Sequence, residues 1–318
     1  MSAEALKFRF GAKFAVLIAC FLALFLMTLT RNMYLITVLI FSCIWAVFAA
    51  TFDLVSAYTN QINLGHAIFF GVGGYTAAFL SIHMGLPPFI TLLLGAIAST
   101  ISGLILGGLC LRVRGPYLLL TTVLANIVLL NLVYSFSRIT GGEDGLPGVK
   151  RIFISPEYNY YFLLSLMIVS VALLVLMVNS RIGYAFKALR DDEDAAEALG
   201  INVVKYKLIA FTTASFFLGL VGAAYAHYLG IVGPTTLSSD LVFMAIVMAI
   251  MGGWGTIIGP VIGSFILTPL NEYLRIIGAY RTLIWGIIAI IIIMKMPGGI
   301  LKSITALSEK IKGRGKGN

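Results

Sequence analysis

Acidic side chains, the residues of this sequence best suited to ion-pair or acid–base chemistry, gather in one short segment. Of the 13 Asp and Glu residues in the 318-residue chain, five lie in "RDDEDAAEALGINVVKYK", residues 190–207. The sequence contains no Ser/His/Asp set, no His and Cys residues at metal-ligand spacing, and no G-x-x-x-x-G-K-[ST] loop to cradle phosphates. We therefore expect no catalytic residue, no metal site and no cofactor bound by this chain itself, which is not expected to be an enzyme.

Histidine is the other residue type that could do chemistry, and the three present are His66, His83 and His227. No Cys or carboxylate stands beside them at the spacing of metal ligands. For His66, a hydrogen-bonded structural role is therefore favoured over a metal site or a proton relay.

The acidic segment carries the signals of a short helix. Asp191 has an N-cap residue type, and Asp194 stands three residues on, where the acid of a capping box is found. Acids in the first turn complement the positive end of the helix dipole, and Gly200 suits the left-handed position that ends a helix. The pattern predicts a helix over residues 192–199 and a new helix that can begin at Asn202.

This short helix admits two interpretations. It could be a solvated connector whose charges keep it soluble, or a surface on which another protein docks. A connector needs neither adjacent small residues nor a glycine at that spacing, whereas Ala195 and Ala196 would let another backbone approach closely. We therefore favour docking.

The composition places the segment in a membrane protein. Hydrophobic residues make up 60% of the chain, charged residues 11%, and the mean hydropathy is +1.01, whereas a soluble domain carries about 25% charged residues. The apolar runs do not alternate as barrel strands would, so the fold class predicted is an all-α polytopic membrane protein. The net charge of +9 is then explained by basic cytoplasmic loops and not by nucleic-acid binding. Three cysteines in apolar runs predict small buried residues and no disulfide framework.

Hydropathy windows of about 19 residues predict a transmembrane domain over residues 14–300, between a cytoplasmic N-terminus (1–13) and a basic cytoplasmic tail (301–318). The basic residues before the first run resemble a signal peptide, but no small-x-small cleavage site follows, so we interpret it as an uncleaved span. Eight to ten spans are expected, with a turn or re-entrant segment as the alternative around "MGGWGTIIGP". The ten are 14–30, 33–52, 65–84, 88–110, 116–136, 160–178, 207–229, 240–258, 261–277 and 281–296.

Positive charges set the orientation. With ten spans, 16 of the 22 Lys and Arg residues fall on one side of the membrane and 6 on the other. By the positive-inside rule, both termini are cytoplasmic. The loop 179–206 with its acidic segment is then cytoplasmic, and the loop 137–159 is external. In that external loop, Glu143 and Asp144 could meet an external partner or remain solvated.

The glycine-rich run "GHAIFFGVGGYTAAFL", residues 65–80, also has two interpretations. Its glycines permit close helix approach, or they mark a broken helix that lines a solute pathway. The preceding polar segment, residues 53–63, slightly favours a pathway because its Asp, Asn and Gln side chains would be costly against lipid. The candidate pathway residues are Asn63, Gly65, His66, Gly71 and Gly74.

Glycines spaced by four predict further helix-packing faces. Gly103 and Gly107 form one pair, and the doubled pattern Gly255, Gly259 and Gly263 forms another, for which a contact with another subunit is one option.

Several motifs resemble one family. Asp194-Ala195-Ala196, three residues and Gly200 are similar to the E-A-A-x-x-x-G loop of bacterial ABC-importer permeases, although the proline of the longer motif is missing. "INLGHAIFFGVGGYTAAFL", "LRVRGPYLLLTTVLANI", "TGGEDGLPGV" and "MGGWGTIIGPVIGSFIL" resemble permeases for branched-chain amino acids, the LivM type. The resemblance covers roughly residues 33–300.

The resemblance implies a heteromeric importer in a bacterial or archaeal plasma membrane. Its partners would be two cytoplasmic ATP-binding subunits, a second homologous permease and an extracytoplasmic solute-binding protein, in contact with lipid and without nucleic acid. ATP would be bound by the partners, and the loop would be a coupling helix that docks on the ATPase. The implied coupling residues are Arg190, Asp191, Asp194, Ala195, Ala196 and Gly200.

Two other functions stay open. A permease of the same architecture could carry urea or another small solute, since nothing in the sequence separates these from branched-chain amino acids. A secondary transporter or channel is less favoured, because it would more often place ionisable residues within its spans.

Overall fold

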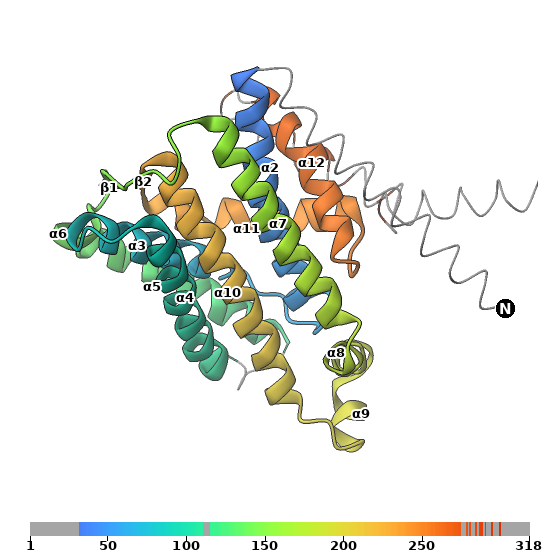
Figure 1. The fold of residues 1–318 in the computed structure, drawn as a ribbon. Coiled ribbons are helices and arrows are strands. Elements are labelled where there is room, and N and C mark those ends of the chain that lie inside the picture. The colour runs from blue at the N-terminus through green and yellow to red at the C-terminus, as the bar shows by residue number, and fades with distance from the viewer. Residues whose placement is uncertain are drawn as a thin grey trace, which may run out of the picture.

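The computed structural model describes residues 32–110 and 115–274, with single positions between 278 and 299, and these residues are largely helical (Figure 1). The expected span 14–30, both terminal segments and much of the expected span 281–296 lie outside this description. The longer helices are α2 (Met33–Ser56), α3 (Ala67–His83), α4 (Pro88–Cys110), α5 (Pro116–Ser135), α7 (Pro156–Val178), α10 (Val203–Leu229), α11 (Ser239–Gly252) and α12 (Ile258–Tyr273). The short elements are α6 (Ser137–Thr140), α8 (Arg181–Asp191), α9 (Glu193–Ala198), the 3-10 helix η2 (Pro234–Leu237), β1 (Leu146–Pro147) and β2 (Ile231–Val232).

Eight of the ten expected spans coincide with these longer helices, which confirms the all-α polytopic class. Five of them, α2, α4, α5, α7 and α10, are long and apolar enough to cross a membrane. α3, α11 and α12 have 17, 14 and 16 residues, short of the roughly 20 that a straight span needs. α11 stops at Gly252 and not near residue 258, because Gly253 and Gly255 take positive φ and turn the chain into α12.

Close backbone contacts hold the centre of the bundle together, where α10 packs on α3 and α4. An added Cβ on Gly73 would stand 2.4 Å from the Cα of Gly219 on α10. One on Gly103 would lie 2.1 Å from the Ser215 hydroxyl, which confirms the packing face predicted for α4. α2 is buried along most of its length between α7, α10 and α12. On α4 and α5, by contrast, large apolar side chains such as Ile101 and Leu124 are exposed, as expected of lipid-facing surfaces.

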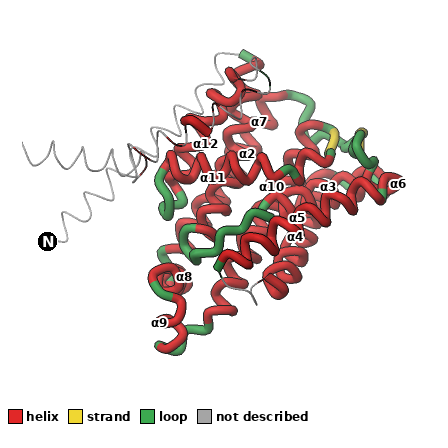
Figure 2. The backbone as a smooth tube through the Cα atoms, turned by 180° about the vertical axis from the view of Figure 1, so that it is seen from behind, coloured by secondary structure: helices red, strands yellow, loops and turns green. Residues whose placement is uncertain are grey.

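The two ends of the bundle carry different features. At one end, β1 pairs antiparallel with β2, so the loop 137–159 lies against the segment that follows α10. The Lys150 ammonium there donates to the Gly85 carbonyl at 2.7 Å, and His227 bonds both Thr91 and the Lys150 carbonyl. At the opposite end lie α8 and α9, as both views show (Figures 1 and 2). This arrangement places the loop 137–159 and the acidic segment at opposite ends, as the predicted topology requires.

Candidate functional site

The acidic segment folds as the short helix α9, with a different N-cap from the one predicted. Asp191 is the last residue of α8, and Asp192 caps α9 by accepting a hydrogen bond from the Ala195 amide at 2.9 Å. The prediction of Asp191 was wrong by one residue because α8 continues through Asp191 before the chain extends. Asp192 then takes φ −160° and ψ 116°, the extended backbone of an N-cap.

The end of α9 follows the predicted glycine signal. Gly200 has φ +84°, its amide donates to the Glu197 carbonyl at 2.9 Å, and the Ile201 amide donates to the Ala196 carbonyl at 3.1 Å. These two bonds form a Schellman motif, in which a left-handed residue satisfies the last carbonyls of a helix. α9 is therefore a short helix with a defined stop at each end.

The two adjacent alanines of α9 differ in burial. Ala196 is 2% exposed because it packs onto the rest of the chain, whereas Ala195 is exposed. Leu199, a large apolar residue, is 82% exposed. The exposed apolar residues of α9 and its C-cap, which we call the α9 outer face, are Ala195, Ala198 and Leu199. Ala196 instead packs against the rest of this chain.

An ion pair joins α9 to a membrane-spanning helix. The Lys207 ammonium lies 2.7 Å from Oε1 of Glu193, and the Lys207 side chain is 7% exposed. Lys207 belongs to the second turn of α10, while Glu193 is the first residue of α9. Sequence reasoning counted Lys207 only as a cytoplasmic positive charge. The available signal was a pair of lysines, Lys205 and Lys207, at the start of a long apolar helix, with Lys207 standing 14 residues from Glu193.

Arg190, the last residue but one of α8, lies beside the loop that joins α11 to α12. Its Nη2 pairs with Asp191 at 3.0 Å, and its Nη1 lies 3.9 Å from where a Cβ on Gly255 would be. The same loop is held from the other side by Asp53 of α2, whose carboxylate accepts from the amides of Gly255 at 2.8 Å and Ile257 at 3.0 Å. Asp53 is fully buried, so the sequence-based expectation that it avoids lipid is confirmed. α2, α8 and the α11–α12 loop therefore meet at one place.

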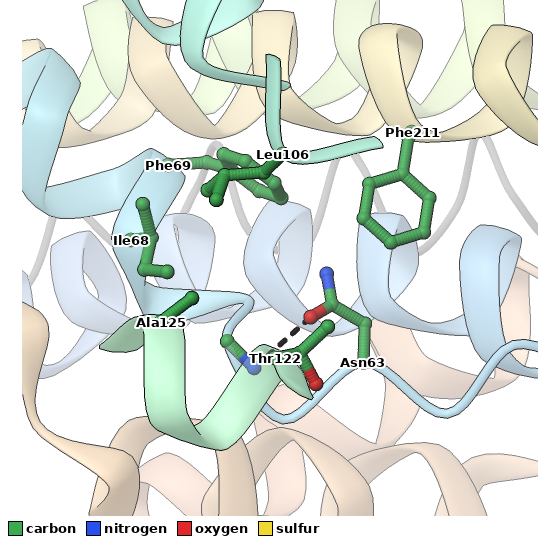
Figure 3. A pocket seen from close by; sticks show the side chains of 8 residues that line it. Asn63, Ile68, Phe69, Leu106, Thr122, Ala125 and Phe211 are labelled. Atoms are coloured by element: carbon green, nitrogen blue, oxygen red, sulfur yellow. Dashed lines mark hydrogen bonds between the residues drawn. The ribbon is translucent and has the colours of Figure 1, made fainter. Parts of the chain in front are cut away.

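The segment between α2 and α3 is pinned to α5 without regular secondary structure. The Leu64 amide donates to the Thr122 hydroxyl at 3.2 Å, and the Asn63 side-chain oxygen accepts from the Gly65 amide at 2.9 Å. A Cβ on Gly65 would lie 2.6 Å from the Thr122 carbonyl oxygen, so only glycine allows this approach. Asn63 and Gly65 line an internal cavity of about 10 Å³ (Figure 3). Its other lining residues are Ile68, Phe69, Leu106, Thr122, Ala125 and Phe211.

The other three candidate pathway residues make packing contacts. His66 bonds Thr51 through Nε2 at 3.2 Å and meets three phenylalanine rings edge-on, while its Nδ1 has no hydrogen-bond partner among the described residues. A Cβ on Gly71 would collide with the Leu237 side chain, and one on Gly74 would lie 3.1 Å from the Gly222 carbonyl oxygen. α3 runs unbroken through both glycines, so close helix approach describes them and the irregular segment lies before the helix.

The second glycine pattern does not form one helix face. Gly255 lies in the loop before α12, while Gly259 and Gly263 of α12 lie against the backbone of Gly252 and Met248. Both helical glycines thus serve packing within this chain. In the described ranges no three His, Cys, Asp or Glu residues are grouped to hold a metal ion.

Comparisons with known proteins place the sequence in context. Residues 34–295 match the family described as "Branched-chain amino acid transport system / permease component". The high-affinity branched-chain amino acid transport system permease protein LivM of Salmonella typhimurium is 26% identical over 242 residues, which are 67% of this chain and 57% of that protein. The chain thus spans a little over half the length of this relative.

Other similar proteins differ in the solute that their names state. The probable branched-chain amino acid permease LivH of Methanocaldococcus jannaschii is 26% identical over 244 residues, which are 72% of this chain and 76% of that protein. The autoinducer 2 import system permease LsrC of Klebsiella pneumoniae is 27% identical over 165 residues, which are 50% of this chain and 45% of that protein. No solved structure is significantly similar to the chain.

Proposed function

From the premise that this chain belongs to the branched-chain amino acid permease family of ABC transporters, we propose that it imports leucine, isoleucine and valine as one permease subunit of an ATP-driven complex. Its partners in this proposal are two cytoplasmic ATP-binding subunits, a second homologous permease and an extracytoplasmic solute-binding protein. The chain itself is a multi-pass inner-membrane protein. It contributes the solute path and the contact with the ATPase, while ATP is bound and hydrolysed by its partners.

The observation that carries the proposal is the construction of α9. A solvated connector has no need of a cap at each end, a buried alanine and a buried ion pair to a membrane helix. A helix that receives force needs all of these, because it must move as a unit and carry its neighbour with it. The α9 outer face is then the surface that docks on an ATP-binding subunit.

Two contacts would pass the movement of α9 and α8 into the membrane. The Glu193–Lys207 pair connects α9 to α10, whose central part packs on α3 and α4. Arg190 lies beside the loop between α11 and α12, which Asp53 ties to α2. When the ATPase pair closes on ATP, α9 moves with it, and these contacts transmit the displacement to α10 and to the α11–α12 loop with α2. The outcome is alternating access to the solute path.

ATP-dependent uptake in proteoliposomes tests this function. The complete complex would be supplied with labelled leucine or labelled urea, with and without internal ATP. Leucine accumulation that stops without ATP supports the proposal. ATP-dependent accumulation of urea, or of another small solute such as those named for the relatives, would support the same mechanism but show that the solute is not a branched-chain amino acid. Uptake by this chain alone, without ATPase subunits, would make it a secondary transporter or channel and contradict the role of α9.

A further inference from the structure

The cavity in Figure 3 combines a polar group without a partner and an apolar wall. Asn63 is 1% exposed. Its side-chain oxygen is fixed by the Gly65 amide, a donor that can only face an oxygen, so its Nδ2 is the group that remains. Among the described residues Nδ2 has no hydrogen-bond partner. Figure 3 shows this nitrogen directed into the space below Phe69, Leu106 and Phe211.

A neighbouring residue repeats this anomaly. Nε2 of Gln61, also 1% exposed, has no hydrogen-bond partner within the part of the chain that the structure describes. Buried polar atoms are satisfied in the great majority of cases, and each exception calls for a cause. Irregular backbone at membrane depth is tolerated where it is enclosed by protein or lines a cavity. An irregular segment with unpartnered amide donors is therefore suited to meet a polar ligand.

We propose that this cavity is a solute-contact site that takes the carboxylate of an aliphatic amino acid on Asn63 and its side chain against Phe69, Leu106 and Phe211. This inference rests on the proposed function and adds a site to it. The amide nitrogen of Asn63 can donate a hydrogen bond to one oxygen of a carboxylate. The apolar residues fit a branched hydrocarbon chain, which urea lacks.

The site is closed in this conformation. A volume of about 10 Å³ is close to what one water molecule needs, far below the size of leucine. Two of the closing side chains belong to moving parts of the proposed mechanism: Phe211 is one helical turn beyond Lys207 on α10, and Leu106 lies on α4, which packs on α10. Residues four apart share one helix face. A shift of α10 through its link to Glu193 would therefore move Phe211 relative to Asn63, and the proposal requires that this movement widens the cavity for the solute.

The first test replaces Asn63 with Asp in the complete complex. This change keeps an oxygen for the Gly65 amide but removes the donor and places a negative charge opposite the solute carboxylate. A lost hydrogen bond to a charged group is worth about 1.5–3 kcal/mol, so we expect the KM for leucine uptake to rise about tenfold or more. The matched control is Asn32→Asp, because Asn32 also uses its side-chain oxygen to accept from backbone amides, at the start of α2. The control should leave KM unchanged.

The second test measures which solute the complex prefers. A change in preference cannot result from misfolding, which could also raise KM in the first test. Phe211→Ala enlarges the apolar end, so uptake of labelled phenylalanine relative to leucine should rise several-fold. A general loss of packing would lower both solutes together and would contradict the proposal.

The results distinguish a failure of the proposed solute site from a failure of the proposed function. Wild-type leucine uptake together with an unchanged KM in Asn63→Asp would overturn the site and leave the function standing, as expected if the cavity holds only a structural water. Absence of ATP-dependent leucine uptake in the wild-type complex would overturn the proposed function, and with it the solute assigned to this cavity.

Discussion

Lys207 is a buried lysine at the start of a membrane-spanning helix, and its charge is balanced by Glu193 at 2.7 Å. Such a pair adds little net stability, because removing two charges from water costs about as much as their attraction returns. Removing Glu193 is different, since the buried Lys207 ammonium then lacks this partner. The pair is therefore better understood as a fixed link between α9 and α10 than as a source of stability.

This reasoning predicts that removing only Glu193 lowers the stability of the protein, and that also removing the Lys207 charge restores it. Glu193→Ala leaves the Lys207 ammonium without this partner and should lower the free energy of unfolding by about 1–3 kcal/mol, less than for a fully buried pair because Glu193 is partly exposed. Glu193→Ala with Lys207→Met should recover most of that loss. Thermal unfolding of the purified chain in detergent measures both.

The same pair of variants also tests the link. If the ion pair transmits movement, the double variant should fold normally and yet accumulate leucine more slowly for each ATP hydrolysed. Full transport in a stable double variant would show that Lys207 and Glu193 are only structural.

Asp53 is a second residue whose role depends on distant parts of the chain. It accepts from two backbone amides that lie 202 and 204 residues away. Ile257, one of the donors, has φ +54°, a conformation that costs energy for a β-branched residue. The two bonds from Asp53 help to hold the α11–α12 loop in this shape.

Asp53→Asn should therefore destabilise the protein although it is nearly isosteric. One amide oxygen can serve only one side of the loop, and the new amide nitrogen would face the other backbone donor. An unsatisfied buried donor costs about 1–3 kcal/mol, so the melting temperature should fall measurably in detergent. The control is Asp240→Asn, at an exposed acid near the start of α11, where the change should be small.

Among the elements, α9 shows what sequence could and could not predict. Its existence, its location and its end at Gly200 followed from local signals, because caps and glycine stops act within a few residues. Its N-cap was missed because Asp191 and Asp192 are equally good candidates, and the choice depends on how far α8 continues. The inward direction of Ala196 could not be predicted, because it is set by contacts with the rest of the chain.

The two alanines of α9 give a test at this scale. Ala195→Trp lies on the α9 outer face, so stability should change by no more than about 0.5 kcal/mol, while binding to the ATP-binding subunits and leucine uptake should fail. Ala196→Trp overfills a buried site and should cost about 1–3 kcal/mol of stability. Co-purification with the ATP-binding subunits and thermal unfolding distinguish the two effects. Normal uptake by Ala195→Trp would contradict docking through this face.

Across the whole molecule, hydropathy located the helices well because each apolar run must bury its backbone bonds within itself. It placed the end of α11 near residue 258 but left open a turn around "MGGWGTIIGP", and the structure has that turn at Gly253, which ends α11 after 14 residues. The sequence also left the glycines of α3 with two interpretations, because glycine is used both where helices pack closely and where a helix is broken. Gly71 and Gly74 proved to be packed only once their neighbours on η2 and α10 were known. The Glu193–Lys207 and Asp53–Gly255 contacts join separate elements, and such pairing is not encoded in local pattern.

The orientation of the molecule in the membrane yields the final prediction. The structure places the loop 137–159 and α9 at opposite ends, and the distribution of 16 against 6 basic residues predicts that α9 is cytoplasmic. Single cysteines can be introduced as Asp144→Cys in the loop and Glu197→Cys on α9, both at exposed positions, in a chain whose Cys20, Cys43 and Cys110 are replaced by Ala. A membrane-impermeant maleimide should label Asp144→Cys in intact cells and Glu197→Cys only after the cells are opened. Leucine uptake by each variant controls for correct folding. The reverse labelling pattern would place α9 outside, where no ATPase could reach it, and labelling of both from one side would contradict the opposite placement itself.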